Sequence, residues 1–182
     1  MLWSGCPIKA RAAAIAALLA APSFVFSAAA PVYAQEKLAC EQFAWPVQRE
    51  QALFKDAALQ TLPSGSVLDS AGRGVALELA PYASAPFLLP PGRQPKTPDS
   101  YGGIVTIANL PQAGTWQVTT SAEAWIEVIQ NGKAIVSSAH TGKRDCEGIR
   151  KSVRFELQPG PVTIQISGAT APSIKLAVLP AD

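Results

Sequence analysis

His140 is the only histidine among the 182 residues, and this limits the chemistry that the chain can perform. An iron site of two histidines and one carboxylate, a histidine-rich zinc site and a His-Glu-x-x-His motif all need two histidines in one chain. A Ser-His-Asp triad would have to use His140. The acidic residues are few and dispersed, and no glycine-rich phosphate loop occurs. We therefore expect no metal, no cofactor and no catalytic residue. A small periplasmic hydrolase that uses His140 with a carboxylate is the alternative.

The most polar stretch of the chain, residues 140–151, is a candidate anion-binding site. Its charged residues are Lys143, Arg144, Asp145, Glu147, Arg150 and Lys151. The cations outnumber the carboxylates, and arginine can grip a carboxylate or phosphate with two hydrogen bonds. The alternative, which we favour, is a solvated loop held in place by Cys146, with His140 as an ordinary surface residue.

Trp125 is the second candidate, because the alternation over residues 124–130 directs it away from the core. If Ile126 and Val128 point inward, Trp125 and Glu127 point outward. An exposed aromatic ring on a sheet can stack against a sugar or bind a partner. The alternative, which we also favour, is that a helix expected over residues 45–58 covers Trp125.

Residues 1–34 are typical of a secretory signal peptide. Lys9 and Arg11 precede an unbroken run of ten apolar residues, and residues 31–34 provide a cleavage site. A membrane anchor is the alternative, but a spanning helix needs ~20 apolar residues. A lipoprotein box ending at Cys40 is a further alternative, which Lys37 weakens. We expect a periplasmic or secreted protein with no membrane span after cleavage.

Removal of this segment would leave a chain without net charge. Lys9 and Arg11 account for two of the 15 basic residues, and the remaining 13 equal the 13 acidic residues. The net charge of the whole chain therefore gives no reason to expect an acidic partner, and we expect no nucleic-acid partner. An envelope protein or a polysaccharide is the expected class of partner, and the sequence does not indicate an oligomeric state.

Two cysteines would remain in the exported chain, since Cys6 lies in the signal segment. An even pair in an exported protein predicts a disulfide between Cys40 and Cys146. A redox pair or a pair of metal thiolates is the alternative, but the chain has no Cys-x-x-Cys spacing to support it.

The elements that must position these residues are short strands with one apolar and one polar face. Alternation predicts strands at 75–79, 101–109, 116–121, 124–130, 133–138, 153–158, 162–167 and 174–178. Asn131-Gly132 is a strong hairpin signal. Residues 81–99 carry six prolines and predict a long surface loop, with a short edge segment at 87–89.

The helix expected over residues 45–58 would place Pro46 at its first position, where a missing N–H costs least. The whole pattern predicts a mostly β fold in which two antiparallel sheets pack face to face, as in a jelly-roll-like sandwich. A closed barrel is the alternative. We divide the chain into a signal peptide (1–34), an N-terminal helical segment (35–62) and a β-sandwich domain (63–182).

Two blocks resemble a group of small exported bacterial proteins of uncharacterised function. They are Cys40-Glu-Gln-Phe-Ala-Trp-Pro46 and Cys146-Glu-Gly-Ile-Arg-Lys-Ser-Val-Arg-Phe155. Such proteins are sometimes labelled homogentisate 1,2-dioxygenase, a family that binds iron through two histidines and a glutamate. This chain has one histidine and therefore contradicts that label.

Two further stretches are similar to the β-sandwich modules attached to secreted hydrolases, such as pre-peptidase C-terminal and carbohydrate-binding domains. They are Gly114-Thr-Trp-Gln-Val-Thr119 and Pro159-Gly-Pro-Val-Thr-Ile-Gln-Ile-Ser167. The similarity implies a sandwich with a binding or accessory role. We expect a non-catalytic exported module whose candidate binding residues are Trp125, Glu127, His140, Lys143, Arg144, Arg150 and Lys151.

Overall fold

The structure is a computed structural model that describes Met1 and residues 39–182. Apart from Met1, the signal peptide predicted over residues 1–34 lies outside the described residues. The start of the helical segment at residues 35–38 lies outside them too. In the described part, no helix combines the length and the hydropathy that crossing a membrane requires.

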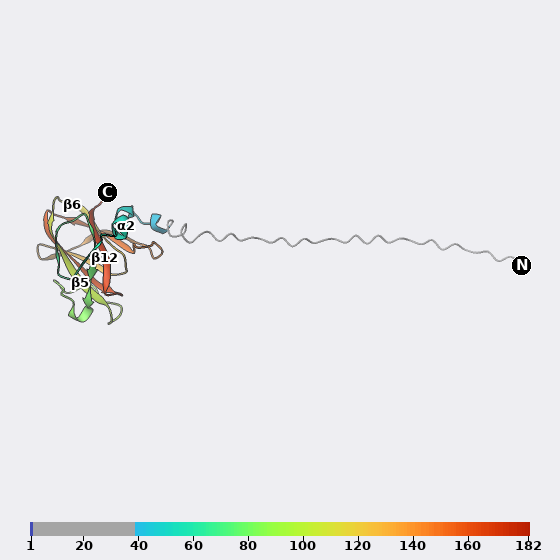
Figure 1. Ribbon diagram of the computed structural model, residues 1–182, viewed down its shortest axis with the longest axis horizontal. Helices are drawn as coiled ribbons and strands as arrows, with labels where there is room; N and C mark the ends of the chain where they lie inside the picture. The colour runs from blue at the N-terminus through green and yellow to red at the C-terminus, as the bar shows by residue number, and fades with distance from the viewer. Residues whose placement is uncertain (2–38) are drawn as a thin grey trace.

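Two six-stranded sheets pack face to face, which confirms the predicted sandwich (Figure 1). The first sheet has the order β1-β3-β12-β6-β10-β9, and the second has the order β2-β5-β11-β7-β8, with β4 also paired to β5. The strands are β1 (Gln60–Leu62), β2 (Val67–Ser70), β3 (Gly74–Glu78), β4 (Ala80–Pro81), β5 (Tyr101–Leu110), β6 (Gly114–Thr120), β7 (Trp125–Gln130), β8 (Lys133–Ile135), β9 (Ser137–Gly142), β10 (Lys151–Leu157), β11 (Gly160–Ala169) and β12 (Ser173–Pro180).

Both sheets are mixed rather than purely antiparallel. The short strands β1 and β2 run parallel to β3 and β5, whereas the other paired strands are antiparallel. β1 and β2 were not predicted, because the segment 60–70 is rich in turn residues and each strand is too short to show alternation. Each adds a few backbone hydrogen bonds at a sheet edge.

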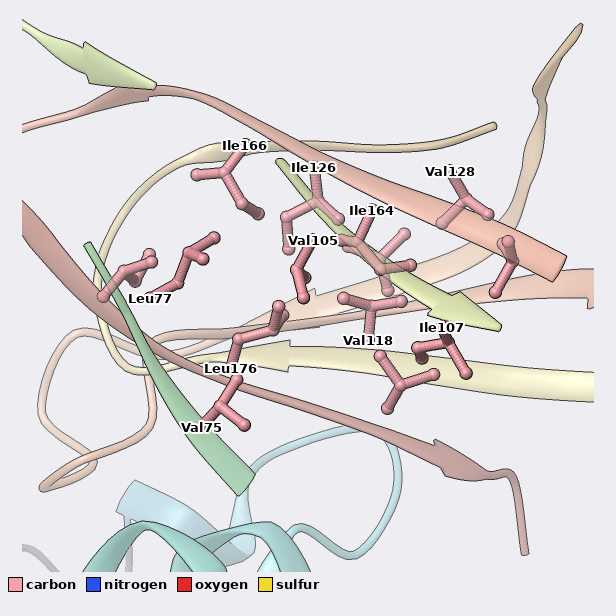
Figure 2. Packing of buried hydrophobic residues seen from close by; sticks show 14 of the residues in the cluster. Val75, Leu77, Val105, Ile107, Val118, Ile126, Val128, Ile164, Ile166 and Leu176 are labelled. Carbon is pink, nitrogen blue, oxygen red and sulfur yellow. The ribbon is translucent and has the colours of Figure 1, made fainter. Parts of the chain in front are cut away.

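The core lies between the sheets and follows the predicted alternation. Figure 2 shows the apolar side chains of the two sheets pointing toward one another. The first sheet contributes Val75, Leu77, Val118 and Leu176, among others, and the second contributes Val105, Ile107, Ile126, Val128, Ile164 and Ile166. Each such side chain stabilises the fold by about 1.5–3 kcal/mol through its removal from water.

Helix α2 (Gln48–Lys55) packs on the outer face of the first sheet, against β3 and β12. It is shorter than the predicted helix. Val47 has a non-helical φ of −126°, so Pro46 precedes the helix instead of opening it. At the other end, Asp56 is extended and its carboxylate accepts a hydrogen bond from the Ala58 N–H at 2.9 Å. This local bond competes with a further helical turn.

The predicted disulfide is present and joins this N-terminal segment to the sandwich. The sulfur atoms of Cys40 and Cys146 are 2.10 Å apart. Around the bond lies a second apolar cluster, separate from the main core, whose members include Phe43, Trp45, Val47, Phe54 and Ile149. Part of the outer face of the first sheet is therefore covered, although many of its own side chains are polar.

The proline-rich loop crosses the outer face of the second sheet. After a short 3-10 helix, η1 (Tyr82–Ser84), the loop runs over β11, where the Gln165 side chain accepts hydrogen bonds from the N–H groups of Leu88 and Leu89 at 2.8 and 3.2 Å. The predicted edge segment at 87–89 is wrong, because these backbone groups bond to a side chain rather than to a neighbouring strand.

The predicted return strand at 133–138 is two strands that belong to different sheets. β8 pairs with β7 in the second sheet, and β9 pairs with β10 in the first, so the chain changes sheets at Val136. His140 therefore lies in β9 and not in a loop, opposite Val153. The sequence pattern did not reveal β9, because its residues are mostly polar or small and neither face alternates with an apolar one. Most of these residues are exposed.

Candidate functional site

Trp125 begins β7 on the outer face of the second sheet. Its strand register places it directly opposite Ser167 of β11. Ile126 points into the core, so the alternation of the strand turns the indole ring outward as predicted. The ring is half-buried. Trp125 and Ser167 both line a small pocket at this end of the sheet.

Two cations lie over the indole ring of Trp125. The guanidinium carbon of Arg93 is 5.4 Å from the ring centroid, and the ammonium nitrogen of Lys151 is 5.2 Å from it. Both separations are within the range of cation–π attraction, which favours these positions for the two side chains. Lys151 also donates a hydrogen bond to the carbonyl oxygen of Ala124 at 3.3 Å. The backbone and the ring together fix its ammonium group.

These residues enclose a pocket with a cavity volume of about 60 Å³. We call it the Trp125 pocket. The side chains of its lining that matter below are Arg93, Lys96, Glu123, Trp125, Lys151 and Ser167. Three of these are cationic and one is anionic, so the lining carries a net charge of +2 (3 − 1). The pocket therefore favours negative charge.

Two buried polar atoms that belong to residues of the lining have no hydrogen-bond partner within the protein. They are the indole Nε1 of Trp125 and the hydroxyl oxygen of Ser167, a residue that is 1% exposed. The other indole groups of residues 39–182 are paired: Trp45 Nε1 donates to Ser152 Oγ at 3.1 Å, and Trp116 Nε1 donates to the Gln112 carbonyl at 3.3 Å. An unpaired buried donor costs about 1–3 kcal/mol, so two at one place mark this pocket as unusual.

The ammonium group of Lys151 is electrostatically frustrated. Burial lowers the pKa of Lys151 below the usual value for lysine. Attraction to Glu123 opposes this shift, and repulsion from Arg150 and Arg93 adds to it. A negative charge in the pocket would relieve the same frustration.

Glu123 and Glu127, the two carboxylates closest to this region in the sequence, serve to hold the pocket together. Glu123 forms an ion pair with Arg150. Glu127 accepts hydrogen bonds from the Gly92 N–H at 2.8 Å and from the Gln165 amide at 2.9 Å. Glu127 therefore anchors the loop that carries Arg93, and it is not among the residues that line the pocket.

Four of the seven predicted residues, Trp125, Glu127, Arg150 and Lys151, meet at this pocket or support it. The other three are His140, Lys143 and Arg144. His140 is exposed on β9, and Lys143 and Arg144 follow that strand, outside the pocket lining. The predicted charged loop is thus divided. The disulfide at Cys146 holds its middle, while Lys151 lies over Trp125 and Arg150 pairs with Glu123.

The predicted cover for Trp125 is wrong. Helix α2 packs on β3 and β12 of the first sheet, whereas Trp125 belongs to the second. The proline-rich loop partly covers the ring instead, through Arg93. Arg93, Lys96 and Ser167 were not among the predicted site residues. Ser167 has a weak sequence signal, as the last residue on the polar face of its strand, whereas an irregular proline-rich loop gives no periodicity from which to place Arg93.

Comparison with known proteins identifies no family. The chain matches no protein-family model and no curated protein sequence. The chemistry of the pocket must therefore be inferred from its own residues. It offers positive charge and hydrogen-bond donors. In residues 39–182, no three His, Cys, Asp or Glu side chains are grouped so that they could hold a metal ion.

Proposed function

We propose that this protein is an exported, non-catalytic binding module that holds a polysaccharide of the cell envelope at the Trp125 pocket. The observation that carries the proposal is the concentration of unpaired polar groups at one outward-facing pocket, the indole N–H of Trp125 and the hydroxyl of Ser167. Polar groups left unpaired in a protein are satisfied when a ligand supplies the missing partner.

The size of the pocket favours one group of a large ligand over a complete small ligand. Pockets that enclose a whole small molecule have volumes of about 300–1,000 Å³. The Trp125 pocket has about 60 Å³ and is open to the surface. A polymer fits this geometry, since one substituent enters while the rest of the chain lies outside.

The distribution of apolar surface favours a polysaccharide over a protein partner. Among residues 39–182, the exposed large apolar side chains are Val67, Leu88 and Val136. Val67 lies on β2 and Val136 follows β8, at opposite edges of the second sheet, while Leu88 lies in the loop over β11. Protein interfaces usually have an apolar centre, and these side chains are too far apart to form one.

The alternative, a hydrolase that uses His140, gains no support from the geometry. His140 is exposed on an edge strand, and no carboxylate of residues 39–182 lies within ion-pair distance of its imidazole ring. A general base in a triad needs such an orienting partner. The binding function is therefore the better conclusion from this site.

Co-sedimentation of the exported protein with isolated envelope polysaccharide tests the proposal. We expect retention that Trp125→Ala abolishes. The matched controls His140→Ala and Lys143→Ala should leave retention unchanged, because neither side chain lines the pocket. Retention that survives Trp125→Ala, or a stoichiometric protein partner without polysaccharide binding, would contradict the proposal. Loss of a hydrolytic activity in His140→Ala would support the alternative.

A further inference from the structure

The unsatisfied groups of the Trp125 pocket are all able to donate hydrogen bonds. An indole nitrogen can only donate, an ammonium group and a guanidinium group can only donate, and a serine hydroxyl can do so. Lys151 has three N–H bonds, and the structure assigns one hydrogen bond to them, with the Ala124 carbonyl. Glu123 is the one carboxylate in the lining, and Arg150 already pairs with it.

The indole ring of Trp125 already has two cations over it, which makes it a poor stacking platform for a neutral sugar. Arg93 and Lys151 both lie over the ring, at 5.4 and 5.2 Å from its centroid. A neutral sugar that stacked on Trp125 would have to displace a cation from a favourable position. It would also leave the ammonium charge of Lys151 and the guanidinium charge of Arg93 without a counter-ion in the pocket.

The volume of the pocket agrees with a small charged group. At about 60 Å³ the cavity has room for a few water molecules. A carboxylate or a phosphate group has this scale, and a sugar ring is larger. A negative group in the pocket would also offset the burial that lowers the pKa of Lys151.

We infer that the Trp125 pocket is an oxyanion site that binds the carboxylate or phosphate substituent of an acidic glycan. Lys151 and Arg93 supply the charge. The Trp125 indole N–H and the Ser167 hydroxyl, which are buried in the unliganded protein, supply directional hydrogen bonds once the cationic side chains over the ring shift onto the anion. Trp125 therefore acts through its edge and not through its face. The inference rests on the proposed function and names the chemical class of its ligand.

Nuclear magnetic resonance of the exported protein with ¹⁵N-labelled tryptophan tests the site directly. The described residues contain three indole N–H groups, of which Trp45 and Trp116 are internally paired and serve as controls. Titration with galacturonate, with inorganic phosphate and with neutral galactose separates the two anion sources from an uncharged sugar. We expect saturable shifts of the Trp125 indole signal with galacturonate or phosphate and none with galactose.

Two variants assign that response to the pocket. Lys151→Met keeps the length of the side chain and removes its charge, and we expect it to weaken anion binding by about tenfold or more, the scale of one charged hydrogen bond. Lys133→Met, at the exposed tip of the β7–β8 hairpin, should leave the affinity unchanged. Equal losses in both variants would overturn the site.

The outcomes distinguish the inference from the function on which it rests. Equal shifts with galactose and galacturonate would overturn the oxyanion site and leave polysaccharide binding intact. Polysaccharide retention that depends on Trp125, combined with an indole signal that no anion shifts, would also overturn the oxyanion site and leave polysaccharide binding intact. Saturable anion binding at Trp125 without retention on any polysaccharide would support the oxyanion site and overturn the glycan assignment.

Discussion

The Glu50 carboxylate accepts a hydrogen bond from the Gln117 side-chain amide at 2.5 Å, and both side chains are completely buried. The other Glu50 oxygen has no partner in the protein. The Gln117 carbonyl oxygen accepts two hydrogen bonds from Arg154, at 3.3 and 3.2 Å, and the Arg154 guanidinium lies 4.2 Å from the ring centroid of Trp45. A polar chain thus ties helix α2 to the outer face of the first sheet.

The first prediction concerns the hydrogen bonds that link Glu50, Gln117 and Arg154. Gln117→Leu should lower the free energy of unfolding by about 3 kcal/mol, because it leaves the buried Glu50 carboxylate without a donor. Adding Glu50→Leu should recover a large part of that loss, since replacing both buried partners with apolar groups is often close to neutral. Urea unfolding of the single and double variants measures both effects.

Gln112→Leu provides the matched control, because this glutamine is exposed and its side chain makes no hydrogen bond in the described structure. It should change the free energy of unfolding by less than about 0.5 kcal/mol. A double variant as unstable as the sum of the two single variants would show that Glu50 and Gln117 are not coupled.

The disulfide gives the second prediction. Its two cysteines are 106 residues apart, and the chain-entropy model gives about 4.7 kcal/mol for closing such a loop, with less found in many proteins. The double variant Cys40→Ser with Cys146→Ser should therefore unfold at a lower urea concentration. Chemical reduction of the unaltered protein should reproduce this loss and should not destabilise the variant further. A variant as stable as the unaltered protein would mean that the bond adds no stability.

The sandwich was predictable because its core strands alternate strictly. Ile126 and Val128, or Ile164 and Ile166, are apolar at every second position, so the sequence shows directly which face is buried. The cysteine pair was predictable for a different reason, since two cysteines outside the expected signal segment leave one pairing. By contrast, β9 has polar or small residues on both faces, and periodicity cannot reveal a strand whose two faces are alike.

The pocket was only half predictable for a physical reason. Trp125 is identifiable from its own strand, because alternation separates it from Ile126. Its neighbour Lys151 was one of several cations in a charged stretch, and the sequence does not show which of them turns toward the ring. Arg93 reaches the ring through a loop that is positioned by the side chains of Gln165 and Glu127. Contacts between a loop and a distant strand leave no local pattern in the sequence.

Gln165 gives the third prediction, because its buried side chain holds the proline-rich loop. It accepts hydrogen bonds from the N–H groups of Leu88 and Leu89, and it donates to the Leu89 carbonyl and to Glu127. Gln165→Leu removes these bonds and should increase hydrogen exchange at Leu88 and Leu89 by at least tenfold, while the exchange of core amides in β11 changes little.

Loosening of this loop should also weaken anion binding at Trp125, because Arg93 depends on the same anchor. Gln158→Leu is the control, since that side chain is exposed and its residue takes part in hydrogen bonds only through its backbone. Unchanged exchange at Leu88 and Leu89 in Gln165→Leu would mean that other contacts, such as the packing of Phe87 on Gly102, are sufficient to hold the loop.

The fourth prediction is a pH dependence of stability that comes from Lys151. Burial lowers its pKa in the folded protein, whereas the unfolded chain has the usual value of about 10.4. Between these two values the unfolded state binds more protons than the folded state. The contribution of Lys151 to the free energy of unfolding therefore increases as the pH rises through this window.

Comparison with Lys151→Met isolates this contribution, because the variant has no titratable group at this position. Urea unfolding at intervals from about pH 7 to about pH 10 should show the unaltered protein gaining stability relative to the variant as the pH rises. Lys133→Met, compared in the same way, controls for the loss of a surface lysine. A difference that stays constant, or one that falls with pH, would contradict the lowered pKa.

A bound oxyanion raises the pKa of Lys151 again, so saturating galacturonate or phosphate should reduce the pH dependence if the Trp125 pocket holds the anion beside this ammonium group.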